Sequence, residues 1–275
     1  MVITETRTDL ALESFESKDK TRLDGVIVRE NGNITTVRII NESGAAALGK
    51  PVGKYITLKV KSFVYDTDIF DGRLYEFKSV LASLLPENTE SVLVAGLGNI
   101  NITADSIGPK TNNYVLSTRH IVDEFRKDEG FEGLSCVSSI DTGVLGNTGI
   151  ESAEIIKGVV AQIKPSCVIA VDALAASSVD RLGNTVQFSD SGISPGSGVG
   201  NHRYEVSEKT LGVPVISVGI PTVVSAAGAD GEESVYVTPR EIDRISEQGA
   251  KLIGMGINVS LHRGIKPEEL YALVG

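Results

Sequence analysis

The stretch SVLVAGLGNINITADSIGP, residues 91–109, indicates the fold most directly. It starts with the apolar run SVLVA, passes through a glycine-rich turn and enters a segment with helical spacing of apolar residues. A buried strand, a short loop and a helix are the opening of a βαβ unit. The same stretch poses a question about function, which is whether its turn binds a phosphate or presents the carboxylate of Asp105.

The alternation of strand and helix continues along the chain. Apolar periodicity predicts helices at 72–85, 107–125, 150–163 and 238–262, and strands at 134–140, 167–175, 185–190 and 213–220. This order predicts an α/β fold with a mostly parallel sheet and helices on both faces.

The N-terminal part has a different pattern. Residues 1–24 are polar and charge-rich, so we expect an exposed arm or short prosegment. Two β-branched runs flank Asn-Gly at 31–32, which predicts a β-hairpin, and 55–65 adds a strand. We therefore expect a β-rich appendage at 25–65 on a single α/β domain, residues 25–275.

Composition excludes several classes of protein. The net charge of −10 argues against binding of nucleic acid, which requires a basic face. No apolar run approaches the roughly 20 residues of a membrane helix, so no membrane association is expected. The two cysteines, Cys136 and Cys167, form no disulfide framework, and we expect a cytoplasmic protein.

The phosphate interpretation of the turn is weak. A dinucleotide-binding loop requires a third glycine where this chain has Asn101, after Gly96 and Gly98. No P-loop pattern occurs either, and we expect no cofactor.

Two aspartates favour the carboxylate interpretation. Asp105 precedes a predicted helix, and Asp172 follows the apolar run CVIAV at the expected end of a strand. The simpler alternatives are an N-cap for Asp105 and a structural acid bonded to helix N–H groups for Asp172. A pair of close carboxyl groups can act as general acid and base, or they can hold a metal with His202 as a third ligand.

A third loop, residues 189–203, is rich in Gly and Ser, and its glycines permit close approach of a peptide backbone. Its alternatives are a third catalytic loop, an oxyanion-type nest of backbone N–H groups and a flexible surface turn. Ser197 lacks the surroundings of a nucleophilic serine, because no G-x-S-x-G motif occurs. His120 fits a packed or solvated side chain, and a cationic His262 suits a helix C-terminus. No HExxH motif or Cys/His cluster indicates zinc.

Eight ordered motifs carry a resemblance. RTDLALE, GLGNINITADSIGP, STRHI, TGIESAEIIKGVV, VIAVDALAASS, SDSGISPGSGVGN, LGVPVISVGIPTVV and VTPREID resemble the germination proteases, which degrade small acid-soluble spore proteins. The resemblance covers about residues 7–262. It implies a phosphorylase/hydrolase-like α/β fold. It also implies an atypical aspartic endopeptidase of the spore core, made as a zymogen and assembled as a homotetramer.

The resemblance also implies site residues. Its two proposed catalytic aspartates correspond to Asp105 and Asp172. Candidate substrate-binding residues follow from the same motifs: Asn99, Arg119, Ser194, Gly196, Gly198 and Asn201. Because the family cuts after Glu, Arg119, Lys110 and Arg203 are candidate cations for a substrate carboxylate, and Glu5 is a candidate self-cleavage point.

Two departures from the family pattern stand out. Only a short segment lies between Val224 and Tyr236, and few residues precede RTDL. The alternatives to the aspartate pair are a metal-assisted peptidase of the hydrogenase-maturation type and an inactive relative that binds spore proteins.

Overall fold

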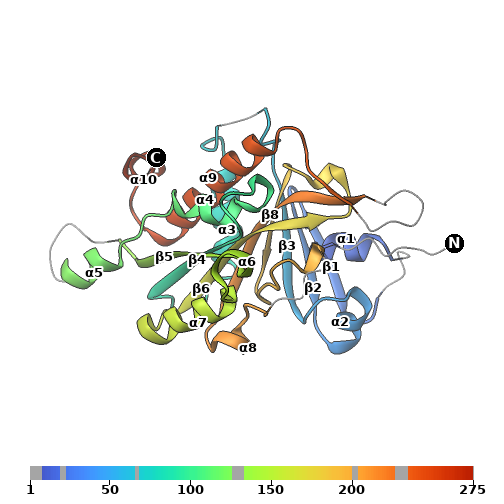
Figure 1. Ribbon diagram of the computed structural model, residues 1–275, viewed down its shortest axis with the longest axis horizontal. Coiled ribbons are helices and arrows are strands. Elements are labelled where there is room, and N and C mark those ends of the chain that lie inside the picture. Colours follow the sequence, from blue (N-terminus) through green and yellow to red (C-terminus); the bar gives the residue numbers. More distant parts are fainter. Residues whose placement is uncertain are drawn as a thin grey trace.

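The computed structural model describes residues 8–18, 23–65, 68–125, 133–199, 204–226 and 235–274. Within these ranges the chain forms one nine-stranded sheet with helices on both faces (Figure 1). The strands are β1 (Val26–Asn31), β2 (Ile34–Ile39), β3 (Gly53–Lys59), β4 (Ser91–Leu97), β5 (Cys136–Gly143), β6 (Cys167–Ala176), β7 (Thr185–Ser189), β8 (Val215–Ala226) and β9 (Val235–Val237).

The helices vary widely in length. They are α1 (Ala11–Glu16), α2 (Glu42–Leu48), α3 (Arg73–Ala82), α4 (Ile107–Asn112), α5 (Arg119–Phe125), α6 (Leu145–Thr148), α7 (Ser152–Ile163), α8 (Glu208–Leu211), α9 (Ile242–Leu261) and α10 (Pro267–Val274). Three short 3-10 turns accompany them: η1 (Thr103–Asp105), η2 (Val179–Arg181) and η3 (Ser197–Val199).

The sheet is parallel at its core and antiparallel towards one side. The strand order is β1-β2-β3-β7-β8-β6-β4-β5, with β9 pairing with β8. Neighbours among β8, β6, β4 and β5 run parallel, and all other pairs run antiparallel. The predicted α/β fold with a parallel sheet is thus confirmed for the core. The predicted hairpin is confirmed as β1 and β2, which extend the main sheet because β3 pairs with β7.

Helices pack on the two faces in separate groups. One face is covered by α3, α4 and α9, and the other by α7 and α8 (Figure 1). Along β6, Ile169 and Val171 face the first group, and Val168 and Ala170 face the second. Because successive residues of a strand point to opposite faces, Asp172 shares the face of α7 and α8.

Part of the expected N-terminal arm is buried. Leu10, Ala11, Leu12 and Glu13 are at most 6% exposed, and α1 packs with α2 against β2 and β3. The prediction of an exposed arm is therefore wrong for this segment. The polar composition predicted exposure because the segment has few apolar residues. Glu13 is nevertheless buried, since backbone N–H groups satisfy its carboxylate. Residues 1–7, which include Glu5, lie outside the described ranges, and the division into an arm and one domain stays a prediction.

The single helix expected over 107–125 is also wrong. The chain forms α4 and α5, separated by residues that bond to other elements. The Thr118 N–H donates to the carbonyl of Val137, and the Val137 N–H donates to the Thr118 hydroxyl at 3.1 Å. Asn258 of α9 also accepts a hydrogen bond from the Leu116 N–H at 2.9 Å. These tertiary bonds satisfy backbone groups that a continuous helix would have used.

Candidate functional site

The loop after β4 holds the carboxylate of Asp105 against its own beginning. The Asn99 N–H donates to Oδ2 of Asp105 at 2.8 Å. Asp105 ends the short turn η1, whereas the N-cap of α4 is Ser106. The alternative of an N-cap role for Asp105 is therefore wrong. Its carboxylate lies at the carboxyl end of β4, as the strand-end argument predicted.

Gly98 makes this arrangement possible. It has a φ of +106°, and a Cβ on it would lie 2.1 Å from the carbonyl oxygen of Asp105. A side chain is therefore excluded by backbone conformation and by space. Gly98, which suggested a phosphate-binding loop, instead leaves room for the backbone of Asp105.

The remainder of the loop is braced from two other elements. The Thr222 hydroxyl of β8 donates to the carbonyl of Ala104 at 2.7 Å. The Ser246 hydroxyl of α9 donates to the carbonyl of Thr103 at 2.7 Å. Hydrogen bonds from β8 and α9 thus fix the turn that contains Asp105.

Asp172 lies inside β6, among apolar residues, and is 4% exposed. Its Oδ1 accepts a hydrogen bond from the N–H of Ala173 at 2.9 Å. Asp172 lies within β6 and not at its end, because the strand continues to Ala176, one residue beyond the strand predicted over 167–175. The alternative of a structural role for Asp172 stays a prediction.

The two aspartates nevertheless lie at the same level of the sheet. Val171 pairs with Gly96, so Asp172 is level with Leu97, the last residue of β4. Asp105 is bound to the N–H of Asn99, two residues beyond Leu97. Adjacent strands therefore bring both carboxyl groups to the carboxyl end of β4.

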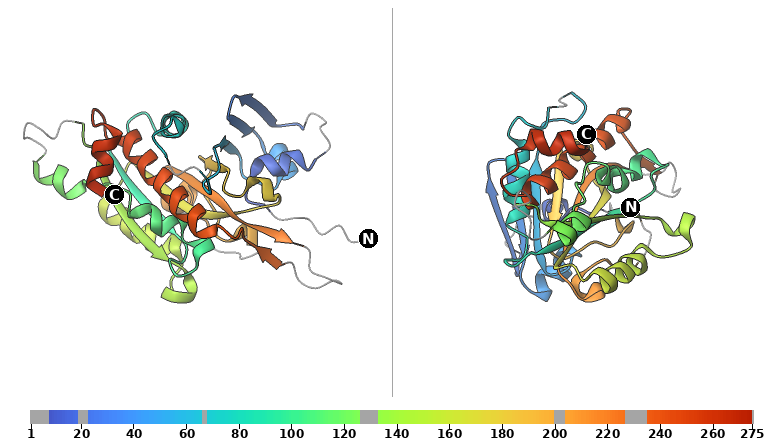
Figure 2. Two further views of the ribbon diagram at one scale, coloured as in Figure 1. Left: turned by 90° about the horizontal axis from the view of Figure 1, so that it is seen from above. Right: turned by 90° about the vertical axis from the view of Figure 1, so that its left-hand side faces the viewer.

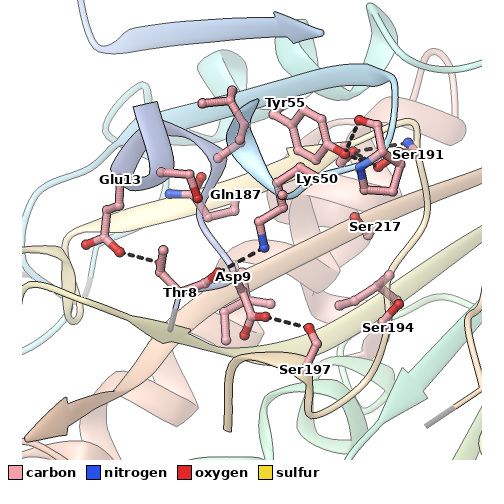
Figure 3. Close-up of a pocket in the computed structure, with 18 of the residues that line it drawn as sticks. Thr8, Asp9, Glu13, Lys50, Tyr55, Gln187, Ser191, Ser194, Ser197 and Ser217 are labelled. Carbon is pink, nitrogen blue, oxygen red and sulfur yellow. Dashed lines mark hydrogen bonds between the residues drawn. The ribbon is translucent and has the colours of Figure 1, made fainter. Parts of the chain in front are cut away.

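A polar pocket of about 710 Å³ lies on the Asp172 face of the sheet (Figure 3). Its floor is formed by β3, β7 and β8, and its walls by α1, by the end of α2 and by the loop after β7. The lining side chains labelled in Figure 3 are Thr8, Asp9, Glu13, Lys50, Tyr55, Gln187, Ser191, Ser194, Ser197 and Ser217. This volume suits a side chain or a short peptide segment.

The sequence prediction missed the N-terminal half of this pocket. The composition of residues 1–24 predicts an exposed arm for Asp9 and Glu13, although both belong to the RTDLALE motif. Lys50, next to the αL residue Gly49, carried no motif. Only the tertiary structure brings these residues opposite the Gly/Ser loop.

The predicted substrate-binding residues fall into different places. Ser194 lines the pocket, and the Gly198 backbone lies against the Asp9 carboxylate, since a Cβ on Gly198 would be 2.3 Å from Oδ2. Gly196 has a φ of +72° in the same loop. Asn99 contributes its N–H to Asp105, and Arg119 is exposed at the start of α5.

Several other predicted residues lie outside the described ranges or away from the pocket. Asn201, His202 and Arg203 lie in the range 200–203, which the structure does not describe. Lys110 lies 3.9 Å from Glu247 in an ion pair on the α4 side. In the described part of the chain, no group of three or more His, Cys, Asp or Glu is placed to hold a metal.

The prediction of a cationic His262 at the C-terminus of α9 is wrong. It is 2% exposed, and burial lowers its pKa. Its Nδ1 accepts a hydrogen bond from the N–H of Ser135 at 3.3 Å. The imidazole therefore joins α9 to the start of β5 in its neutral form. His120 is exposed.

Sequence comparison identifies the family. The family described as germination protease matches residues 4–235. The chain belongs to the germination protease family. Membership makes it a peptidase. In the described ranges, no helix is both long and apolar enough to cross a membrane.

Named relatives match almost the whole chain. A germination protease of Caldanaerobacter subterraneus subsp. tengcongensis is 38% identical over 317 residues, covering 98% of this chain and 98% of the relative. One from Clostridium perfringens (strain ATCC 13124) is 38% identical over 318 residues, covering 96% and 97%. One from Bacillus cereus (strain G9842) is 38% identical over 280 residues, covering 96% of this chain and 76% of the relative.

Two further facts come from the comparisons. The first two alignments span more positions than the 275 residues of this chain, so those relatives have residues that it lacks. Among solved structures, a NiFe hydrogenase maturation protease from Thermococcus kodakarensis KOD1 is 18% identical, with a TM-score of 0.37 over 65% of this chain and 99% of that one.

Proposed function

We propose that this peptidase is an endopeptidase of the spore core that cleaves small acid-soluble spore proteins during germination. The family name supports a role in germination. The acidic surface, with a net charge of −10, suits a basic substrate that has left DNA.

In the proposed mechanism, Asp105 and Asp172 act as general acid and general base on a peptide bond. The observation that carries this is the buried carboxyl of Asp172, inside an apolar strand and level with the loop that fixes Asp105. A carboxyl group kept in such a place is costly for stability and is retained where it has a role. One carboxylate removes a proton from water, and the other protonates the leaving amide nitrogen.

Replacing either aspartate with asparagine tests this mechanism. Asp105→Asn and Asp172→Asn each remove a proton-transfer group while preserving shape, so cleavage of a purified small spore protein should fall by about 10²–10⁴-fold. The readout is the initial rate followed by electrophoresis and mass spectrometry, with circular dichroism to confirm folding. Asp141, near the end of β5, accepts a hydrogen bond from Asn112 of α4. Asp141→Asn is the matched control and should retain activity.

Two outcomes separate the alternatives. Full activity in both aspartate variants would end the proposal of a dyad. Loss of activity with a chelator, restored by one divalent ion, would instead favour a metal held by Asp105, Asp172 and His202. The same rates on full-length substrate separate a peptidase from an inactive binding relative.

Assembly as a homotetramer and synthesis as a zymogen belong to this proposal and are checked by light scattering and by N-terminal sequencing.

A further inference from the structure

Strand β8 has a bulge where it runs beside β6. The ladder between these strands is regular up to the pair of Leu174 and Pro221, and it resumes at the pair of Ala175 and Val223. Within the described strands, Thr222 is therefore an extra residue without a partner on β6. Such a β-bulge is rare between parallel strands, and bulges often re-aim a side chain next to an active site.

The side chain and the backbone of the bulge residue are both held by hydrogen bonds. The Thr222 hydroxyl donates to the carbonyl of Ala104 at 2.7 Å. The Thr222 carbonyl accepts the hydroxyl of Thr238, the residue after β9, at 2.9 Å. Thr222 is 1% exposed, and a buried polar group without a partner is costly. The bulge is thus fixed with its hydroxyl directed at the turn η1.

This hydroxyl supports a carbonyl that has no second donor among the described residues. The Ala104 carbonyl accepts only from Thr222 there. The carbonyl of Thr103, one residue earlier, accepts from the hydroxyls of Ser246 at 2.7 Å and Ser106 at 2.8 Å. Loss of the Ser246 hydroxyl would leave a donor in place, whereas loss of the Thr222 hydroxyl would not.

Thr222 connects the surroundings of the two aspartates. Ala104 immediately precedes Asp105 in the chain. The bulge begins beyond the pair that contains Leu174, two residues after Asp172 on β6. One hydrogen bond therefore ties the turn of Asp105 to the part of the sheet that contains Asp172.

The separation of the two carboxyl groups matters for the proposed chemistry. A general acid and a general base must each lie within hydrogen-bond reach of the group whose proton they transfer. A displacement of about 1 Å in such a site can lower the rate by about 100-fold. A bond that limits movement of one carboxyl group relative to the other therefore affects the rate.

Resting on the proposed function, we propose that Thr222 is a positioning residue, which holds Asp105 at the working distance from Asp172 through its bond to Ala104. Because Thr222 is buried, it acts through Asp105 and makes no contact with the substrate. The β-bulge is the feature that places its hydroxyl at η1.

The first test separates kcat from KM. Thr222→Val removes the hydroxyl at nearly constant shape, and kcat on a purified small spore protein should fall by about 10- to 100-fold. KM should stay within about twofold, because no contact with the substrate is lost. Thr222→Ser retains a hydroxyl and should restore most of kcat.

The second test needs no substrate. The Asn99 N–H donates to the Asp105 carboxylate at 2.8 Å, so its hydrogen–deuterium exchange reports whether that carboxylate keeps its place. In Thr222→Val, exchange at Asn99 should become up to about tenfold faster, as expected for the loss of one hydrogen bond. Thr222→Ser should show the exchange of the unmodified protein.

Thr111→Val is the matched control. Thr111 is 0% exposed, and its hydroxyl donates to the carbonyl of Ile107 within α4 at 2.8 Å. This variant loses the same kind of bond, so urea unfolding should show a similar loss of stability, with kcat and exchange at Asn99 unchanged. If Thr222→Val does not fold, Thr222→Ala removes the same hydroxyl with a smaller side chain.

Four results would overturn the proposal. They are an unchanged kcat in the variants without the hydroxyl, a rise in KM at constant kcat, a Thr222→Ser variant as slow as Thr222→Val, and an equal loss of kcat in Thr111→Val.

The two proposals fail in different ways. If Asp105→Asn and Asp172→Asn still cleave, the proposed mechanism is wrong, whatever Thr222 does. If both are inactive and Thr222→Val retains full kcat and slow exchange at Asn99, the mechanism stands and the role of Thr222 alone is wrong.

Discussion

Gly98 shows how a single residue fixes the site. Its positive φ turns the chain at the end of β4, and its missing side chain leaves room for the Asp105 backbone. The Asn99 N–H then donates to the Asp105 carboxylate. The position of Asp105 therefore depends on the absence of a Cβ atom at Gly98.

Replacing Gly98 should separate activity from folding. In Gly98→Ala the new Cβ would lie 2.1 Å from the Asp105 carbonyl oxygen, so the loop must move. We expect peptidase activity to fall at least tenfold, with a loss of stability of about 1–3 kcal/mol from the strained backbone. Rates on a spore protein and urea unfolding measure the two effects.

Gly32 offers the matched control. It also has a positive φ, of +57°, but a Cβ there would meet nothing within 4 Å. Gly32→Ala should therefore lose stability without losing activity. Equal activity in Gly98→Ala and Gly32→Ala would mean that the β4 loop tolerates movement of Asp105.

Among the elements, α1 is the one whose position is least evident from sequence. Its six residues are too few for a stable isolated helix. Packing against β2 and β3 and the bonds of Glu13 to Ser177 and Ser178 hold it in place. It thereby closes one wall of the pocket (Figure 3).

Two glutamates on this helix should behave differently. Glu13 is 4% exposed and accepts backbone N–H groups, so Glu13→Ala should cost about 2–4 kcal/mol by leaving them unsatisfied. Glu16 forms a partly exposed ion pair with Arg181 at 2.8 Å, and Glu16→Ala should cost at most about 1 kcal/mol. Free energies of unfolding from urea titration provide the comparison, and similar losses in both variants would show that α1 is not held through Glu13.

At the scale of the molecule, one sheet joins the hairpin region to the parallel core (Figure 2). The joint lies at the β3–β7 pair, where Phe188 packs edge-on against Phe77 of α3 with ring centroids 4.8 Å apart. Both rings belong to the cluster that contains residues of β3 and α9. The main core thus includes β3, the strand that pairs with the hairpin, whereas Val37 and Ile39 of the hairpin pack in a separate cluster with α1 and α2.

This continuity predicts cooperative unfolding. Phe77→Leu and Phe188→Leu should each destabilise the protein by about 1–2 kcal/mol, less than the 3–5 kcal/mol of a truncation to Ala. A double-mutant cycle should give a coupling of about 0.5–1.5 kcal/mol from the ring contact. Unfolding followed by far-ultraviolet circular dichroism and by tyrosine fluorescence should give one midpoint, and two separated midpoints would show that the hairpin unfolds independently.

The sequence by itself determined the α/β class and the hairpin, and it singled out Asp105 and Asp172 as candidates, because apolar periodicity, Asn-Gly and acids next to apolar runs are local signals. It did not determine the break between α4 and α5, the neutral state of His262 or the burial of α1. Those depend on bonds from Thr118, His262 and Glu13 to residues far away in the chain. The pocket of Lys50 and Gln187 was decided by tertiary structure alone, since strand order places Gln187 and Gly219 in register with Asp172 and no local pattern records that order.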